Sequence, residues 1–124
     1  MSKILIIDDL ATETAIMKSV VTSIGHTVVT ASDGEAGYAM AKSERPDLIL
    51  LDVVMPKMDG FQTCRKIKKD DETAHIPVIF VTTKNQDTDR SWGLKQGASD
   101  FVSKPFSASE LAGKISNLLG ASAS

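Results

Sequence analysis

The sequence lacks the marks of several protein classes. Cys64 is its only cysteine, which excludes an internal disulfide and fits a reducing cytosol. No apolar run approaches the ~20 residues that a bilayer-spanning helix needs. The first apolar run, residues 4–7, is short and leads straight into two aspartates, so it is not a signal peptide. We therefore expect a cytoplasmic protein with no membrane partner.

Excess positive charge is also lacking. The formal net charge is −2, whereas a nucleic-acid-binding surface calls for a strongly basic patch, so no nucleic-acid partner is expected. Neither G-x-G-x-x-G nor G-x-x-x-x-G-K-[ST] occurs, and the loop after the first apolar run is acidic, which would repel a phosphate without metal. These observations disfavour a nucleotide- or flavin-binding protein.

Four short apolar runs, however, each end in residues that can handle a phosphoryl group. The runs cover 4–7, 48–51, 78–81 and 101–103, and the residues that follow them are Asp8 and Asp9, Asp52, Thr82, and Lys104. Short apolar runs with polar boundaries are typical of strands buried on both faces in a parallel sheet. All carboxyl ends of such a sheet lie at one edge, where open α/β sheets bind their ligands.

Segments with helical spacing separate these runs. Ile16, Val20 and Ile24 recur every four residues and predict a helix over 11–24, which a glycine ends. Cys64 has the spacing of a helix core residue and not of a reactive thiol. Further helices are predicted between Asp33 and Pro46 and over 59–69, 86–96 and 107–119, with one more strand over 26–31. Five strands alternating with five helices predict a parallel sheet with helices on both faces.

The segment 86–96 fits this pattern least well. Trp92 and Leu94 are its only large apolar residues, and Gly93 lowers its helix propensity by about 1 kcal/mol relative to alanine. One interpretation is a shallowly packed surface helix. The other is a helix that shifts easily, because moving elements come from the least stable parts of a fold. The sequence does not separate the two.

The polar strand ends predict a magnesium-dependent phosphoryl site. Crowded carboxylates raise one another's pKa unless a cation offsets them, and a hard oxygen site with room for water suits Mg²⁺. Asp52 is the candidate nucleophile because it stands alone after the central strand, and a carboxylate nucleophile gives an aspartyl phosphate. Lys104 would supply charge to one phosphoryl oxygen and Thr82 would donate to another.

As a set, these residues resemble the CheY-like receiver domains of two-component response regulators over essentially the whole chain. The matching motifs are IIDD, the D-x-x-M-P-x-M-D-G stretch from Asp52 to Gly60, Thr82 at its strand end, and Lys104-Pro105. The resemblance implies a flavodoxin-like, doubly wound α/β fold of five parallel strands in the order 2-1-3-4-5 with five helices. It also implies that 1–124 is a single receiver domain.

The resemblance assigns a role to each site residue. Asp52 is expected to be the phosphoacceptor, aided by Lys104. Asp9 is expected to bind Mg²⁺ directly and Asp8 largely through water, with Asp52 and the backbone carbonyl of Val54 as further ligands.

Thr82 and Phe101 are expected to form the conformational switch, with Phe101 turning inward as Thr82 moves toward the phosphoryl group. The Lys104-Pro105 peptide is expected to be cis. Val54 and Lys84 occupy positions that influence phosphoryl lifetime in the family; Lys84 would add positive charge nearby.

Within the family, the stretch VTTKNQDTDRSWGLKQGASDFVSKPF resembles PilH-like regulators of type IV pilus (twitching-motility) chemosensory systems. We expect a stand-alone, monomeric receiver that takes its phosphoryl group from a CheA-type histidine kinase or its phosphotransfer domain. Its output would be binding of a partner at a face made of 86–96, Phe101 and 107–119. Alternatives are a phosphate sink for the kinase or the receiver of another chemotaxis-like pathway.

Two other readings are weaker. A phosphohydrolase with an aspartate nucleophile generally carries a second acid two residues after that nucleophile, where this chain has Val54, and a substrate-covering cap, for which 124 residues leave no room. A degenerate receiver that serves only for docking is disfavoured because the set of site residues is complete. The domain would catalyse its own phosphorylation and hydrolysis, but its product would be a signal, so we do not expect a metabolic enzyme.

Overall fold

The computed structural model describes the backbone of residues 1–123 and the side chains of residues 1–119. The strands are β1 (Lys3–Ile7), β2 (Thr27–Ala31), β3 (Leu48–Leu51), β4 (Val78–Thr82) and β5 (Asp100–Ser103). The helices are α1 (Ala11–Ser23), α2 (Gly34–Glu44), α3 (Gly60–Lys69), α4 (Asp87–Lys95) and α5 (Ala108–Ala123). All strand pairs are parallel and the order is β2-β1-β3-β4-β5, so the predicted flavodoxin-like fold is confirmed.

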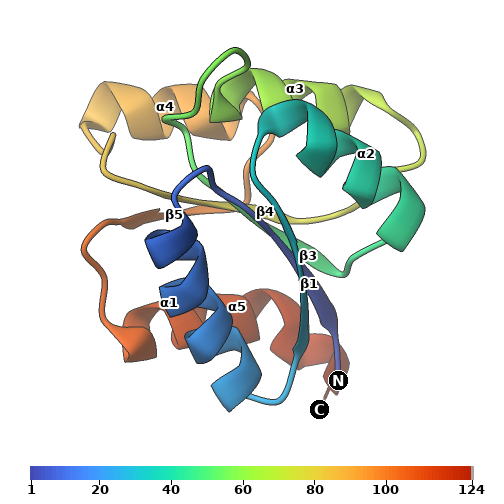
Figure 1. The fold of residues 1–124 in the computed structure, drawn as a ribbon, viewed down its shortest axis with the longest axis vertical. Coiled ribbons are helices and arrows are strands. Elements are labelled where there is room, and N and C mark those ends of the chain that lie inside the picture. The colour runs from blue at the N-terminus through green and yellow to red at the C-terminus, as the bar shows by residue number, and fades with distance from the viewer. Residues whose placement is uncertain (124) are drawn as a thin grey trace.

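The sheet lies between two helical layers, with α1 and α5 on one face and α2, α3 and α4 on the other (Figure 1). Successive side chains of β1 alternate between them: Ile4 and Ile6 pack with α1 and α5, whereas Leu5 and Ile7 pack with the other layer. Both faces are therefore buried, which is why the strands are almost entirely apolar.

The inward face of α1 includes only part of the apolar recurrence that predicts the helix. Met17, Val20 and Val21 are buried, whereas Ile16 is 51% exposed. Buried positions on a helix recur at intervals of three and four, because 3.6 residues make a turn. The four-residue recurrence therefore identifies the helix but does not define its inward face.

Side chains cap the N-termini of three helices. Asp33 accepts from the backbone N–H of Ala36, Asp59 forms a reciprocal capping box with Gln62, and Ser107 accepts from the N–H of Glu110. Among the described residues, no helix is both long and apolar enough to cross a bilayer.

Candidate functional site

The register of the sheet brings Asp8 and Asp52 together. Ile7 pairs with Leu51 across β1 and β3, so the next residue of each strand leaves the sheet at the same level. The backbone N–H of Asp52 still donates to the carbonyl of Ile7, at 3.0 Å. The two carboxylates therefore stand on rigid strand ends, as the sequence predicts.

The other half of the site comes from β4 and β5. Thr82 pairs with Ser103, and the backbone N–H of Lys104 donates to the carbonyl of Thr82 at 2.9 Å. The Lys104-Pro105 peptide is cis, as the resemblance implies. The four strand ends that the sequence singles out thus meet at one edge of the sheet.

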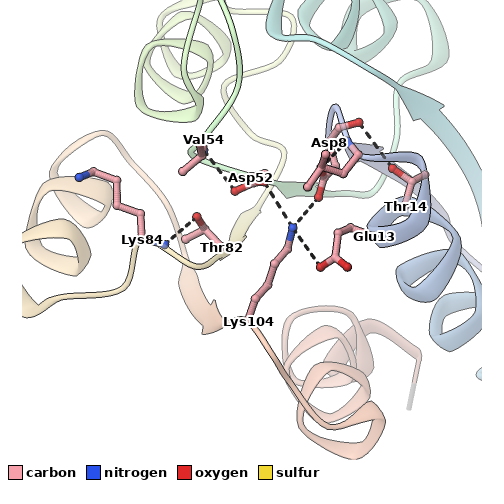
Figure 2. A network of polar contacts seen from close by, with 9 residues as sticks. Asp8, Glu13, Thr14, Asp52, Val54, Thr82, Lys84 and Lys104 are labelled. Carbon is pink, nitrogen blue, oxygen red and sulfur yellow. Dashed lines mark hydrogen bonds and ion pairs between the residues drawn. The ribbon is translucent and has the colours of Figure 1, made fainter.

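The ammonium group of Lys104 lies at the centre of the site, and Figure 2 shows carboxylates on three sides of it. Its Nζ is 2.7 Å from Oδ2 of Asp8 and 3.3 Å from Oδ2 of Asp52. A third carboxylate, Glu13, places Oε1 at 3.5 Å. Asp8 and Asp52 are 2% and 4% exposed, so their interactions with Lys104 are shielded from water.

Burial and ion pairing shift the pKa values of Asp8 and Lys104 in opposite directions. Burial raises the pKa of Asp8 above its ordinary value, although the hydrogen bond from Lys104 opposes the shift. Burial lowers the pKa of Lys104, but the hydrogen bond to Asp8 and the charge of Asp52 outweigh it, so the pKa is raised. Lys104 is therefore held in its charged form near Asp52.

Three carboxylates form a cluster that suits a metal ion. Oxygen atoms of Asp8, Asp9 and Asp52 lie within 4.8 Å of one another, and Asp9 is exposed to solvent. An all-oxygen donor set open to water on one side is the kind that Mg²⁺ takes, because Mg²⁺ usually keeps several waters. The donor chemistry of the site therefore fits magnesium.

The loop after β3 holds Asp52 in place. Oδ1 of Asp52 accepts from the backbone N–H of Val54 at 3.2 Å, and Val54 itself is 55% exposed. The N–H of Gly60 donates to the carbonyl of Val53 at 2.8 Å, which brings the start of α3 against the end of β3. A Cβ at Gly60 would lie 2.1 Å from the carbonyl oxygen of Asp52, so only glycine allows this approach.

Thr82 is fully buried, and its hydroxyl accepts from the backbone N–H of Lys84 at 3.1 Å. The ammonium of Lys84 pairs with Asp89 at 3.3 Å, and its side chain extends away from Asp52 toward α4 (Figure 2). The ammonium of Lys84 is thus paired with α4 in this structure.

Phe101 lies inside the protein. It is 4% exposed, and its ring centre is 5.5 Å from that of Phe80. Arg90 of α4 lies over the Phe101 ring and donates to the hydroxyl of Ser103 at 3.0 Å. Phe101, the expected switch residue, is therefore in its inward position in this structure.

Two residues of this region were missed from the sequence. Glu13 lies on the first turn of α1, where a carboxylate reaches over the sheet edge; its position four residues after Asp9 was an available signal. The other is Gly93, which the sequence identifies only as a residue that lowers the helix propensity of α4. A Cβ added at Gly93 would lie 3.1 Å from the rings of Phe80 and Phe101. Its lack of a side chain lets α4 approach these rings.

Comparison with known proteins agrees with this geometry. The family model described as response regulator receiver domain matches residues 4–116, and the chain belongs to this family. Its sequence is 45% identical to Protein PilH of Pseudomonas aeruginosa over 96% of this chain and 98% of PilH. The chain spans between 26% and 48% of several longer curated relatives.

Solved structures give the same assignment. The chemotaxis protein CheY4 of Vibrio cholerae has a TM-score of 0.90 at 28% identity, with 96% of this chain and 99% of that chain covered. The receiver domain of the sensor histidine kinase PA1611 from Pseudomonas aeruginosa has a TM-score of 0.88 at 28% identity, covering 96% and 98%. That structure has a magnesium ion coordinated in its active site cleft. The chain is thus a CheY-like response regulator receiver of two-component signalling, similar to PilH, and receivers take phosphoryl groups from histidine kinases.

Proposed function

We propose that Asp52 accepts a phosphoryl group from the phosphohistidine of a CheA-type kinase or its phosphotransfer domain. A carboxylate oxygen of Asp52 would bond to phosphorus as the phosphorus–nitrogen bond breaks, and the released imidazole would take a proton from solvent. The product is an aspartyl phosphate. The observation that carries the proposal is the convergence of buried Asp52 with the Lys104 ammonium at 3.3 Å and the acidic cluster.

Each neighbour of Asp52 would have its own task. Lys104 would hold one phosphoryl oxygen by charge, and the Thr82 hydroxyl would donate to another after giving up its bond from Lys84. Asp8, Asp9 and Asp52, with the backbone carbonyl of Val54, would hold Mg²⁺. When bound, Mg²⁺ would supply positive charge against the carboxylate and phosphoryl oxygens.

The signal would leave through a partner protein. We infer that 1–124 works as a single receiver, which the similarity over 98% of PilH supports, and that this receiver is monomeric. The same similarity favours a role in a chemosensory pathway that controls type IV pili. The protein would act in the cytoplasm, and its buried, unpaired Cys64 is compatible with that compartment. The output face would comprise α4, Phe101 and α5, where α4 is shallow enough to shift: Trp92 is 45% and Leu94 55% exposed.

The test is incubation with acetyl phosphate and Mg²⁺ followed by intact mass. Wild type should gain the mass of one phosphoryl group, and Asp52→Asn should gain none. Chelation of Mg²⁺ should abolish the gain. An unmodified wild type at saturating Mg²⁺ would overturn the proposal, and so would phosphorylation that persists in Asp52→Asn.

A further inference from the structure

A second charged region lies between the last turns of α3 and α4. It is an open cleft of about 460 Å³, lined by Arg65, Lys68, Lys69, Lys95, Gln96 and Gly97. Helices that follow parallel strands run back toward the opposite edge of the sheet, so this cleft is remote from Asp52. It takes no part in the phosphoryl chemistry described above.

Arg65 is held in place inside this cleft. Its Nε donates to Oε1 of Gln96 at 2.7 Å, and its guanidinium carbon lies 5.9 Å from the ring centre of Trp92. Gln96 is itself only 8% exposed. Within the described part of the chain, the terminal nitrogens of Arg65 have no partner. A fixed guanidinium with a free two-nitrogen edge is prepared to bind a carboxylate through two hydrogen bonds.

The neighbouring cations also lack acidic partners. Most lysines outside the cleft pair with carboxylates, for example Lys42 with Asp70 and Lys66 with Glu35, whereas Lys18 and Lys57 make no ion pair with a described residue. Lys69 and Lys95 make no ion pair with any described residue. In a chain of net charge −2, this concentration of unpaired positive charge marks a local surface for an anion.

Lys68 lies deeper and holds the wall of the cleft. Its ammonium donates to the carbonyls of Ala74 and Ile76, at 3.1 and 2.5 Å. Its aliphatic chain packs on Gly97, where an added Cβ would lie 2.7 Å from Cγ of Lys68. Lys68 is therefore a fixed part of the cleft wall, whereas the other cations are exposed.

The backbone of the cleft disfavours a phosphate ligand. The N–H groups of Gln96, Gly97 and Ala98 all donate to carbonyls of α4. Phosphate sites generally use free N–H groups, such as those of a helix N-terminus, and these three residues offer none. Cations spread over two helices suit several carboxylates along an extended chain better than one compact anion.

We propose that this cleft binds an acidic segment of a partner protein. Arg65 pairs with one carboxylate through both terminal nitrogens, and Lys69 and Lys95 pair with carboxylates on either side. The interaction bridges α3 and α4 and does not require phosphorylation of Asp52.

The probe for this proposal is an acetylated octapeptide in which glutamate alternates with serine, titrated into the protein while backbone amide shifts are recorded. Shifts should move at Arg65, Lys69 and Lys95, and the affinity should fall as salt is raised. The peptide with glutamine in place of glutamate should not bind. The double variant Arg65→Gln with Lys95→Gln should bind about tenfold more weakly, since exposed charge pairs contribute modestly.

The matched control is Lys18→Gln with Lys66→Gln, which removes the same charge from α1 and from another face of α3. It should bind the peptide like wild type, and so should Asp52→Asn, which separates this site from the phosphoryl site. Equal weakening in both double variants would overturn the proposal, as would the absence of binding at low salt. Inorganic pyrophosphate that binds more tightly than the peptide would overturn it in favour of a phosphate site.

Discussion

Glu13 lies 3.5 Å from the Nζ of Lys104, the same ammonium that contacts Asp8 at 2.7 Å and Asp52 at 3.3 Å. One buried cation is thus shared among three carboxylates, and a phosphoryl group on Asp52 would have to compete with Asp8 and Glu13 for it. The side chain of Glu13 is 30% exposed, so of the three it is the carboxylate that water screens most.

Glu13→Gln should speed phosphorylation of Asp52 by acetyl phosphate a few-fold at saturating Mg²⁺. The substitution removes the ion pair between Glu13 and Lys104, and a partly exposed ion pair contributes about 0.2–1 kcal/mol. It also removes a negative charge that repels the anionic donor. The rate of mass gain measures the effect. Glu72→Gln, which changes the same charge in the loop after α3, is the control and should leave the rate unchanged. An unaltered or slower rate in Glu13→Gln would rule out this role.

The sheet and its acidic edge could be predicted because they depend on local patterns. Apolar runs such as 48–51 identify buried strands, and in a parallel sheet the residues that follow them must share one edge. The spacing of Glu13 from Asp9 was a local signal, but the strand-end pattern does not include Glu13, and its contact with Lys104 depends on the direction in which α1 leaves the sheet. The inward face of α1 could not be predicted for a related reason: Ile16 belongs to the apolar recurrence but is exposed, since one interval does not define the orientation of a helix.

The role of Gly93 shows a second limit. Helix propensity shows only that glycine destabilises a helix relative to alanine. Its benefit arises from Phe80 and Phe101, which pack against it from two strands distant in sequence. Such a benefit is a property of tertiary packing, and the sequence pattern of α4 carries no sign of it.

Gly60→Ala should destabilise the fold although alanine favours helices by about 1 kcal/mol. The new Cβ would meet the backbone at Asp52 and Val53, at 2.1 and 2.7 Å, and neither atom belongs to a flexible side chain. We expect a loss of about 2 kcal/mol or more in the free energy of unfolding, measured by urea denaturation. Gly113→Ala is the control, because nothing lies within 4 Å of its added Cβ. If Gly60→Ala lowers the free energy of unfolding no more than Gly113→Ala does, the close approach of Gly60 to the backbone of Asp52 and Val53 would be contradicted.

Asp70 should titrate far below an ordinary aspartate. The hydrogen bond from the Tyr38 hydroxyl, with help from the N–H of Glu72 and from Lys42, lowers the pKa of Asp70 to about 2. Because the folded pKa is depressed, the stabilisation is fully present above the ordinary aspartate pKa and is lost as pH falls through about 2.

Carboxyl-carbon NMR of Asp70 checks this pKa directly. Tyr38→Phe should raise it toward the ordinary value, because it removes the largest cause of the shift. Lys42→Gln should raise it less. A pKa that Tyr38→Phe leaves unchanged would show that the phenol does not hold the carboxylate.

Cys64 should be inert toward thiol reagents in the folded protein. It is fully buried, its Sγ lies 3.5 Å from the carbonyl of Gln96, and burial raises the pKa of the thiol to about 11. At pH 8 the smaller thiolate fraction alone should slow the reaction about 100-fold, and exclusion of the reagent should slow it further. The measurement compares the rate of reaction with a chromogenic disulfide in buffer and in urea, where the unfolded chain supplies the reference. Reaction in buffer should follow the rate at which α3 and α4 separate, so it should accelerate in Gly60→Ala. A native rate equal to that in urea would contradict the packing of Cys64 between these helices.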